Sequence, residues 1–146
     1  TIRYQIQVML RIERIFEAAY IQEELDTYNP LIPSGQNLKA TFMLEYDDID
    51  ERKIMLHNLK GVEKKMWIQV GDHPRIVPIS DEDLERENEE KTSSVHFMRF
   101  EFSSADIAAL RAGEPLNMGI DSEFICPNKV RVEDPTRANL MADFAA

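Results

Sequence analysis

Twice along this chain, a segment of alternating apolar and polar side chains is followed by helix signals and then by another short apolar segment. The alternating segments cover residues 38–46 and 94–102. A period of two is typical of a β-strand that buries one face. The repeated order of strand, helix and strand predicts an α+β domain, with a ferredoxin-like split βαβ antiparallel sheet that has these two segments at its centre.

Two helices are expected between the strands. Asp48 and Ser103 each stand three residues before an acid, which is the spacing of a capping box, so a helix is expected to begin after each of them. Gly61 and Gly113 are expected to end these helices. The other expected strands are a pair at residues 66–70 and 116–120 and a short edge piece at residues 75–79.

The two ends of the chain differ in pattern. From Ile2 onward the apolar residues recur with the period of a helix, which predicts one long additional N-terminal helix to about Asp26. That helix is expected to begin before Thr1, so the sequence is interpreted as an N-terminally truncated fragment. Residues 122–146 have little periodicity and are expected to form an extended tail of a single domain covering residues 1–146.

Composition excludes several classes of protein. The chain has 27 acids against 17 bases and a formal charge of −10, whereas a nucleic-acid partner requires a positive face. No apolar run approaches the roughly 18 residues of a membrane span, so a cytoplasmic protein without membrane contact is expected. One cysteine, Cys126, cannot form an internal disulfide or hold an iron–sulfur cluster or structural zinc alone. No cofactor is predicted.

Half of the net charge lies in residues 80–91, which contain seven acids and two bases. This segment is predicted to be either a short solvated helix capped by Ser80 or a mobile loop. Acidic surfaces steer encounters with basic partners. The residues predicted to dock such a partner are Asp81, Glu82, Asp83, Glu85 and Glu87.

His96 and Arg99 are the polar residues of most interest in the second alternating segment. For His96, a hydrogen-bonded core histidine is favoured over a metal ligand, because buried polar groups usually have partners. Arg99 shares a face with Glu101 and is expected near Glu45, which favours a cross-strand ion pair. The alternative is that Arg99 binds a carboxylate or phosphate through its planar guanidinium.

Glu13 and Glu17 are one helical turn apart and could offer two carboxylates to a metal. Di-iron bundles also need a Glu-x-x-His motif, which occurs nowhere in the sequence, so a solvated helix face is favoured. A metal- or small-anion site is nevertheless kept as an alternative. It would use the second sheet face, with His96 and Arg99 together with Glu45 or Glu13.

Four blocks together resemble a bacterial family catalogued only as domain of unknown function number three-five-zero-one. The blocks are YQIQVMLRIERI at 4–15, ELDTYNPLIP at 24–33, LKATFMLEY at 38–46 and KTSSVHFMRF at 91–100. The resemblance spans about residues 1–121, without the basic segment that usually precedes it in the family and without a match for the tail. It implies a gene neighbourhood with a rubrerythrin-like protein and an iron–sulfur oxidoreductase, and therefore a role near peroxide defence or electron transfer.

The sequence and the resemblance together favour a non-enzymatic accessory or adaptor protein that binds a rubrerythrin-like or iron–sulfur redox partner. No catalytic residue is predicted. Two alternatives stay open: a metal- or small-anion-binding protein, possibly an enzyme, and a structural homodimer built on the amphipathic sheet face.

Overall fold

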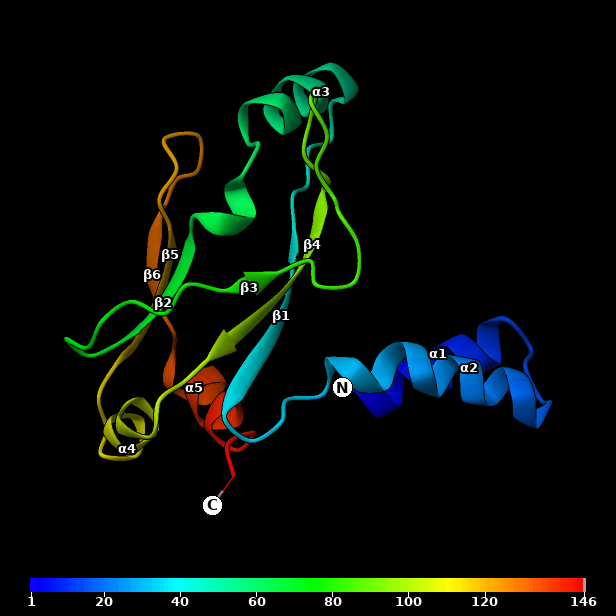
Figure 1. Ribbon diagram of the computed structural model, residues 1–146, viewed down its shortest axis with the longest axis horizontal. Coiled ribbons are helices and arrows are strands. Elements are labelled where there is room, and N and C mark those ends of the chain that lie inside the picture. Colours follow the sequence, from blue (N-terminus) through cyan, green and yellow to red (C-terminus); the bar gives the residue numbers. More distant parts are fainter. Residues whose placement is uncertain (146) are drawn as a thin grey trace. The chain divides into compact units, whose positions relative to one another are not determined.

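A computed structural model describes residues 1–145 of the chain, which form two compact units. Unit 1 is Thr1–Pro33, and unit 2 begins at Ser34. Unit 1 is helical, and unit 2 contains every strand of the described residues (Figure 1). No helix in residues 1–145 combines the length and apolar character that crossing a membrane would require.

Unit 1 is a hairpin of two helices. They are α1 (Ile2–Ile12) and α2 (Ala18–Tyr28), and a short 3-10 turn, η1 (Asn29–Leu31), follows them. The single helix predicted to run to about Asp26 is therefore wrong. Arg14 has a φ of +53°, a left-handed conformation that cannot continue a right-handed helix. The chain reverses there, and α2 packs beside α1.

The strands of unit 2 form two antiparallel sheets. In the first, β4 (Val95–Glu101) lies between β1 (Asn37–Met43) and β3 (Ile79–Ser80). In the second, β5 (Leu116–Ile120) lies between β2 (Met66–Val70) and β6 (Lys129–Arg131). An isolated bridge between Ile68 and Ile76 tethers the chain leading into β3 to β2.

The predicted α+β class is confirmed, but a single ferredoxin-like sheet is not. Each sheet has three strands, and β1 is an edge strand instead of a central one. The strands predicted to complete one sheet, β2 and β5, instead pair with each other. A third strand, β6 from the C-terminal tail, pairs with β5 and extends this second sheet.

Three α-helices flank the sheets. The capped helices are confirmed as α3 (Ile49–Asn58) and α4 (Ser104–Arg111), each with its predicted cap residue accepting a backbone hydrogen bond. Figure 1 shows α3 at one end of unit 2 and α4 and α5 at the other. The extended tail is corrected, because it contains β6 and α5 (Asp134–Met141).

One core joins the two sheets. In the β1–β4 register, Leu38 pairs with Phe100 and Phe42 with His96, so these side chains share a face. Phe100 is fully buried there, together with residues of β2, β5 and α4. Phe144 closes this core by an edge-to-face contact with Phe102 at 5.0 Å. A smaller cluster includes Leu56 of α3, and its buried members are Leu44, Leu56, Leu59 and Val62.

Candidate functional site

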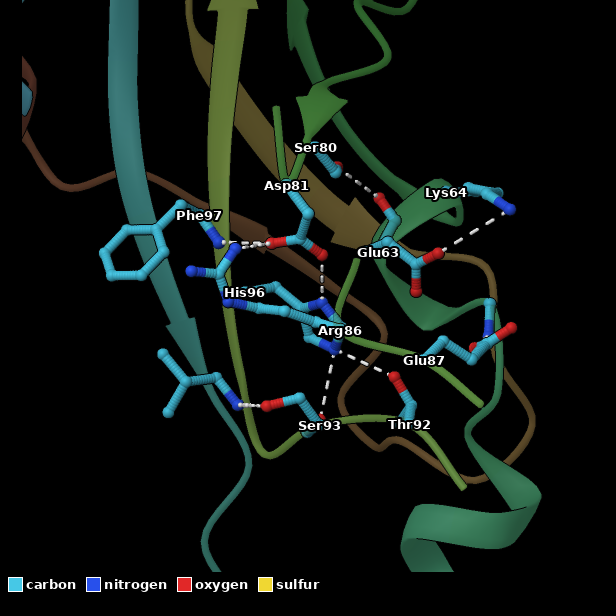
Figure 2. Close-up of polar contacts among 12 residues, drawn as sticks. Glu63, Lys64, Ser80, Asp81, Arg86, Glu87, Thr92, Ser93, His96 and Phe97 are labelled. Atoms are coloured by element: carbon cyan, nitrogen blue, oxygen red, sulfur yellow. Dashed lines mark hydrogen bonds and ion pairs between the residues drawn. The ribbon is translucent and has the colours of Figure 1, made fainter. Parts of the chain in front are cut away.

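The buried histidine of β4 has a carboxylate partner from the acidic segment. His96 has no exposed surface, and its Nδ1 donates to Asp81 Oδ2 over 2.6 Å (Figure 2). Asp81 follows β3 at the edge of β4 and has a φ of +52°. Its other oxygen accepts from the Phe97 backbone N–H at 3.0 Å. The favoured interpretation of His96, a core histidine with its hydrogen bonds made, agrees with this geometry.

The second ring nitrogen completes an arrangement that resembles a hydrolase triad. His96 Nε2 lies 2.9 Å from Thr92 Oγ1 and 3.1 Å from the Ser93 carbonyl oxygen. Carboxylate, imidazole and hydroxyl in this order are the groups of nucleophilic catalysis. Here, however, Thr92 is only 1% exposed and His96 is wholly buried, so the hydroxyl is covered by the surrounding protein. These hydrogen bonds therefore attach the loop that contains Asp81 to strand β4.

Arg86 makes a second attachment of the acidic segment to the sheet. Its guanidinium forms a two-bond pair with Asp83, at 2.6 and 2.7 Å, and a third bond to Asp81 at 3.1 Å. The carbon centre of the guanidinium lies 4.7 Å from the Phe97 ring centroid, a cation–π contact. The hydrogen bonds from Arg86 lower the pKa of Asp83 to about 2.

The acidic segment is a folded loop, so of the two predicted alternatives for residues 80–91 the helix is wrong. Within this loop, Glu87 and Thr92 form an isolated antiparallel β-bridge that closes a small turn. Asn88 Oδ1 accepts from the backbone N–H groups of Glu90 and Lys91, both at 2.9 Å. The tip of the turn is attached to the end of α3 by a 2.6 Å contact between His57 Nδ1 and the Glu90 carbonyl.

An open hollow of about 470 Å³ lies beside this turn. Three glutamates, Glu85, Glu87 and Glu89, line it with Asn88, Lys60 and Gly61. Glu87 is half-buried and accepts a hydrogen bond from the Gly61 backbone N–H, whereas Glu85 and Glu89 are exposed. The hollow therefore presents carboxylates on a backbone that is fixed at several points.

The predicted docking residues have different environments. Asp81 points inward to His96, and its side chain is 11% exposed. Glu82 and Asp83 are exposed but pair with Arg99 and Arg86 respectively. Glu85 is exposed, with no hydrogen bond or ion pair of its side chain in the described part of the chain. Exposed Glu89 and Glu90 were not among the predicted docking residues, although they lie in the same acidic run.

Arg99 lies on the opposite face of β4 from His96. It forms a two-bond ion pair with Glu82, at 3.0 and 2.7 Å, and a close pair with Glu101. Hydrogen bonds to these two carboxylates raise the pKa of Arg99. Arg99 is therefore ion-paired, but with Glu101 of its own strand and Glu82 of the acidic segment, so the favoured cross-strand pair near Glu45 is wrong.

The structure does not gather the residues of the predicted metal or anion site. Strand alternation separates His96 from Arg99, and Glu45 is exposed beyond the end of β1. Glu13 is the exposed C-cap of α1 in unit 1. Within residues 1–145, no three histidine, cysteine or acidic side chains are placed to hold a metal ion.

Two further polar features had no sequence signal. The side chain of Glu63, in the short turn η2 (Val62–Lys64), is 8% exposed, and its Oε2 has no hydrogen-bond partner in the described structure. His73 Nδ1 contacts Asp106 Oδ1 at 2.8 Å. The contact between His73 and Asp106 joins segments 33 residues apart in the sequence, which periodicity does not report.

Comparisons with known proteins show which family the sequence of the chain matches. The family model described as "Protein of unknown function (DUF3501)" matches residues 1–144, so the similarity extends over the tail that the blocks at 4–100 did not cover. A crystal structure of a protein of unknown function from Burkholderia pseudomallei K96243 is 45% identical. Its TM-score is 0.89, over 99% of this chain and 75% of that chain. No curated protein matches.

Proposed function

Because the chain belongs to the DUF3501 family of proteins of unknown function, we propose a role inferred from its own surface: it is a non-enzymatic accessory domain that docks a basic surface of a redox protein. The docking element is the set of exposed carboxylates of the acidic segment that make no ion pair within the described residues, Glu85, Glu89 and Glu90. The partner class is a rubrerythrin-like or iron–sulfur oxidoreductase protein, as the family resemblance implies. This partner would act in the cytoplasm.

The observation that supports this proposal is the fixed backbone beneath the exposed carboxylates. The buried pair of His96 and Asp81, together with the Arg86 contacts, orders the loop before any partner binds. A preordered loop loses less conformational entropy on association than a mobile one. Unpaired surface carboxylates then accelerate encounter with a basic partner, in a way that salt screens.

The test is the affinity of the full chain for a rubrerythrin from the same genome, measured by isothermal titration calorimetry at two salt concentrations. Binding is expected to weaken at high salt. The variant Glu85→Lys/Glu89→Lys is expected to bind at least tenfold more weakly than the wild-type chain. The control Glu123→Lys/Asp143→Lys makes the same change in net charge at exposed positions elsewhere in unit 2 and is expected to bind as the wild type does.

Two results would contradict the proposal. The first is affinity that does not change with salt. The second is an equal loss in the docking variant and its control, which would show that only total charge matters. If rubrerythrin does not bind, the same two variants measured against the iron–sulfur oxidoreductase decide whether the acidic segment docks either partner.

A further inference from the structure

Unit 1 leaves five large apolar side chains exposed, Tyr4, Ile12, Phe16, Tyr20 and Ile32. Ile6 is its only buried residue, whereas Phe16 is 83% exposed and Tyr4 is 71% exposed. Ile12 and Tyr20 are also more than half exposed. Units shorter than about 40 residues rarely bury enough apolar surface to be stable alone, and oligomerisation is one common remedy. The hairpin therefore needs a second surface.

The charges of the hairpin indicate what that surface is. Helix α1 has two bases, Arg3 and Arg11, and no acid. Helix α2 has three acids, Glu23, Glu24 and Asp26, and no base. Within residues 1–33, none of these five charged groups makes an ion pair. One helix thus offers unpaired positive charge and the other unpaired negative charge.

We propose that the hairpins of two copies of this chain pair with each other, with α1 of one copy against α2 of the other. A two-fold arrangement makes this contact twice, because each copy has both a basic and an acidic helix. The four helices then form a bundle that buries the exposed aromatic and aliphatic side chains between the copies. Complementary charge selects this pairing over one that places like helices together. This inference goes beyond the adaptor function and is independent of the acidic segment.

Sedimentation equilibrium of the full chain tests the proposal, with two charge-reversed variants. The first is Arg3→Glu/Arg11→Glu, which makes α1 acidic. The second is Glu23→Lys/Glu24→Lys/Asp26→Lys, which makes α2 basic. The wild-type chain is expected to be a dimer, and each variant alone is expected to dissociate with at least a tenfold higher Kd. A 1:1 mixture of the two variants is expected to form a heterodimer, because each altered helix then faces its opposite charge.

The mixture distinguishes contacts between copies from contacts within one copy. In each variant both helices have the same sign of charge, so only the other variant can supply the opposite charge. The control Arg52→Glu/Arg131→Glu makes the same charge change as the first variant at exposed positions of unit 2 and is expected to dimerise as the wild type does. Circular dichroism reports whether the hairpins stay helical. A monomeric wild-type chain at all concentrations would overturn the proposal, and so would a mixture that stays monomeric.

Discussion

At the scale of single residues, the environment of His96 depends on its hydrogen-bond partner Asp81, fifteen positions earlier in the sequence. Alternation along residues 94–102 was enough to predict that His96 is buried, because it shares a period with Met98 and Phe100. Its partner was not predictable in the same way. Asp81 leaves β3 with a positive φ, and such a residue carries no periodic signal. The acid was therefore assigned to a docking surface instead of to the core.

The variant His96→Ala is expected to lower the free energy of unfolding by about 3 kcal/mol, because it leaves the Asp81 carboxylate without its buried partner. Urea unfolding measures this loss. The control His57→Ala removes an exposed histidine with one backbone contact and is expected to cost less than about 1 kcal/mol. Equal losses in the two variants would mean that the buried pair contributes no more than a surface hydrogen bond.

Gly119 tests the packing of the second sheet. A Cβ at this position would lie 2.4 Å from Trp67 Cζ2 and 2.5 Å from the Asn128 carbonyl oxygen. Gly119→Ala is therefore expected to destabilise unit 2 by about 2 kcal/mol, measured by urea unfolding followed through Trp67 fluorescence. The control Gly61→Ala meets no atom within 4 Å and pays only for its φ of +74°, about 1 kcal/mol. A smaller loss at Gly119 than at Gly61 would contradict the close contact.

Ionisation of two acids links pH to stability. Arg86 holds the pKa of Asp83 at about 2, below the unfolded value of about 3.9. Burial raises the pKa of Asp106, but hydrogen bonds from Ser103 and His73 outweigh it, so the net shift is downward. Both acids bind protons more weakly in the folded chain. Their stabilisation is thus complete above about pH 4 and is lost as the pH falls toward 2.

Urea unfolding between pH 5 and pH 2 is expected to show this loss, with a smaller pH dependence in Asp83→Asn than in the wild-type chain. Asp72→Asn is the matched control, since exposed Asp72 makes no ion pair within the described residues. If Asp72→Asn changed the pH dependence as much as Asp83→Asn, the pair with Arg86 would not be its source.

At the scale of elements, the sequence predicts where a helix begins when a side chain accepts a hydrogen bond from the backbone of that same helix. Asp48 and Ser103 were predicted as caps from spacing alone, and both accept the expected bond. The break at Arg14 was invisible, because it contains neither proline nor glycine and the apolar period continues across it. Strand β6 was missed because all three of its residues are exposed, and helix α5 because it packs only two half-buried apolar side chains, Leu140 and Met141, against the core.

The cap of α4 gives a test at this scale. Ser103 Oγ accepts from the Asp106 N–H, while Asp106 Oδ2 accepts from the Ser103 N–H at 3.0 Å. Ser103→Ala removes the hydroxyl and is expected to cost about 1 kcal/mol in chemical unfolding. The neighbouring Ser104→Ala is exposed and makes no cap bond, so it is expected to be neutral. A neutral Ser103→Ala would show that Asp106 alone satisfies the helix terminus.

At the scale of the whole molecule, the order of strands depends on contacts that no local pattern fixes. The sequence identified all four main strands, but pairing divides them into β1 with β4 and β2 with β5. Alternation says which face of a strand is buried and not which strand lies beside it. The two sheets cohere because the core cluster draws on both, including Leu38 and Phe100 from one and Ile68 and Val70 from the other.

The same distribution of buried residues predicts that unit 2 folds without unit 1. Apart from Ile6, every buried apolar side chain of the described chain belongs to unit 2. A chain of residues 34–146 is therefore expected to unfold cooperatively in urea, with the Trp67 fluorescence of the full chain. It is also expected to sediment as a monomer, because it lacks the hairpin proposed to pair two copies. A truncated chain without a cooperative transition would show that unit 1 stabilises unit 2, and a truncated dimer would place the contact between copies outside the hairpin.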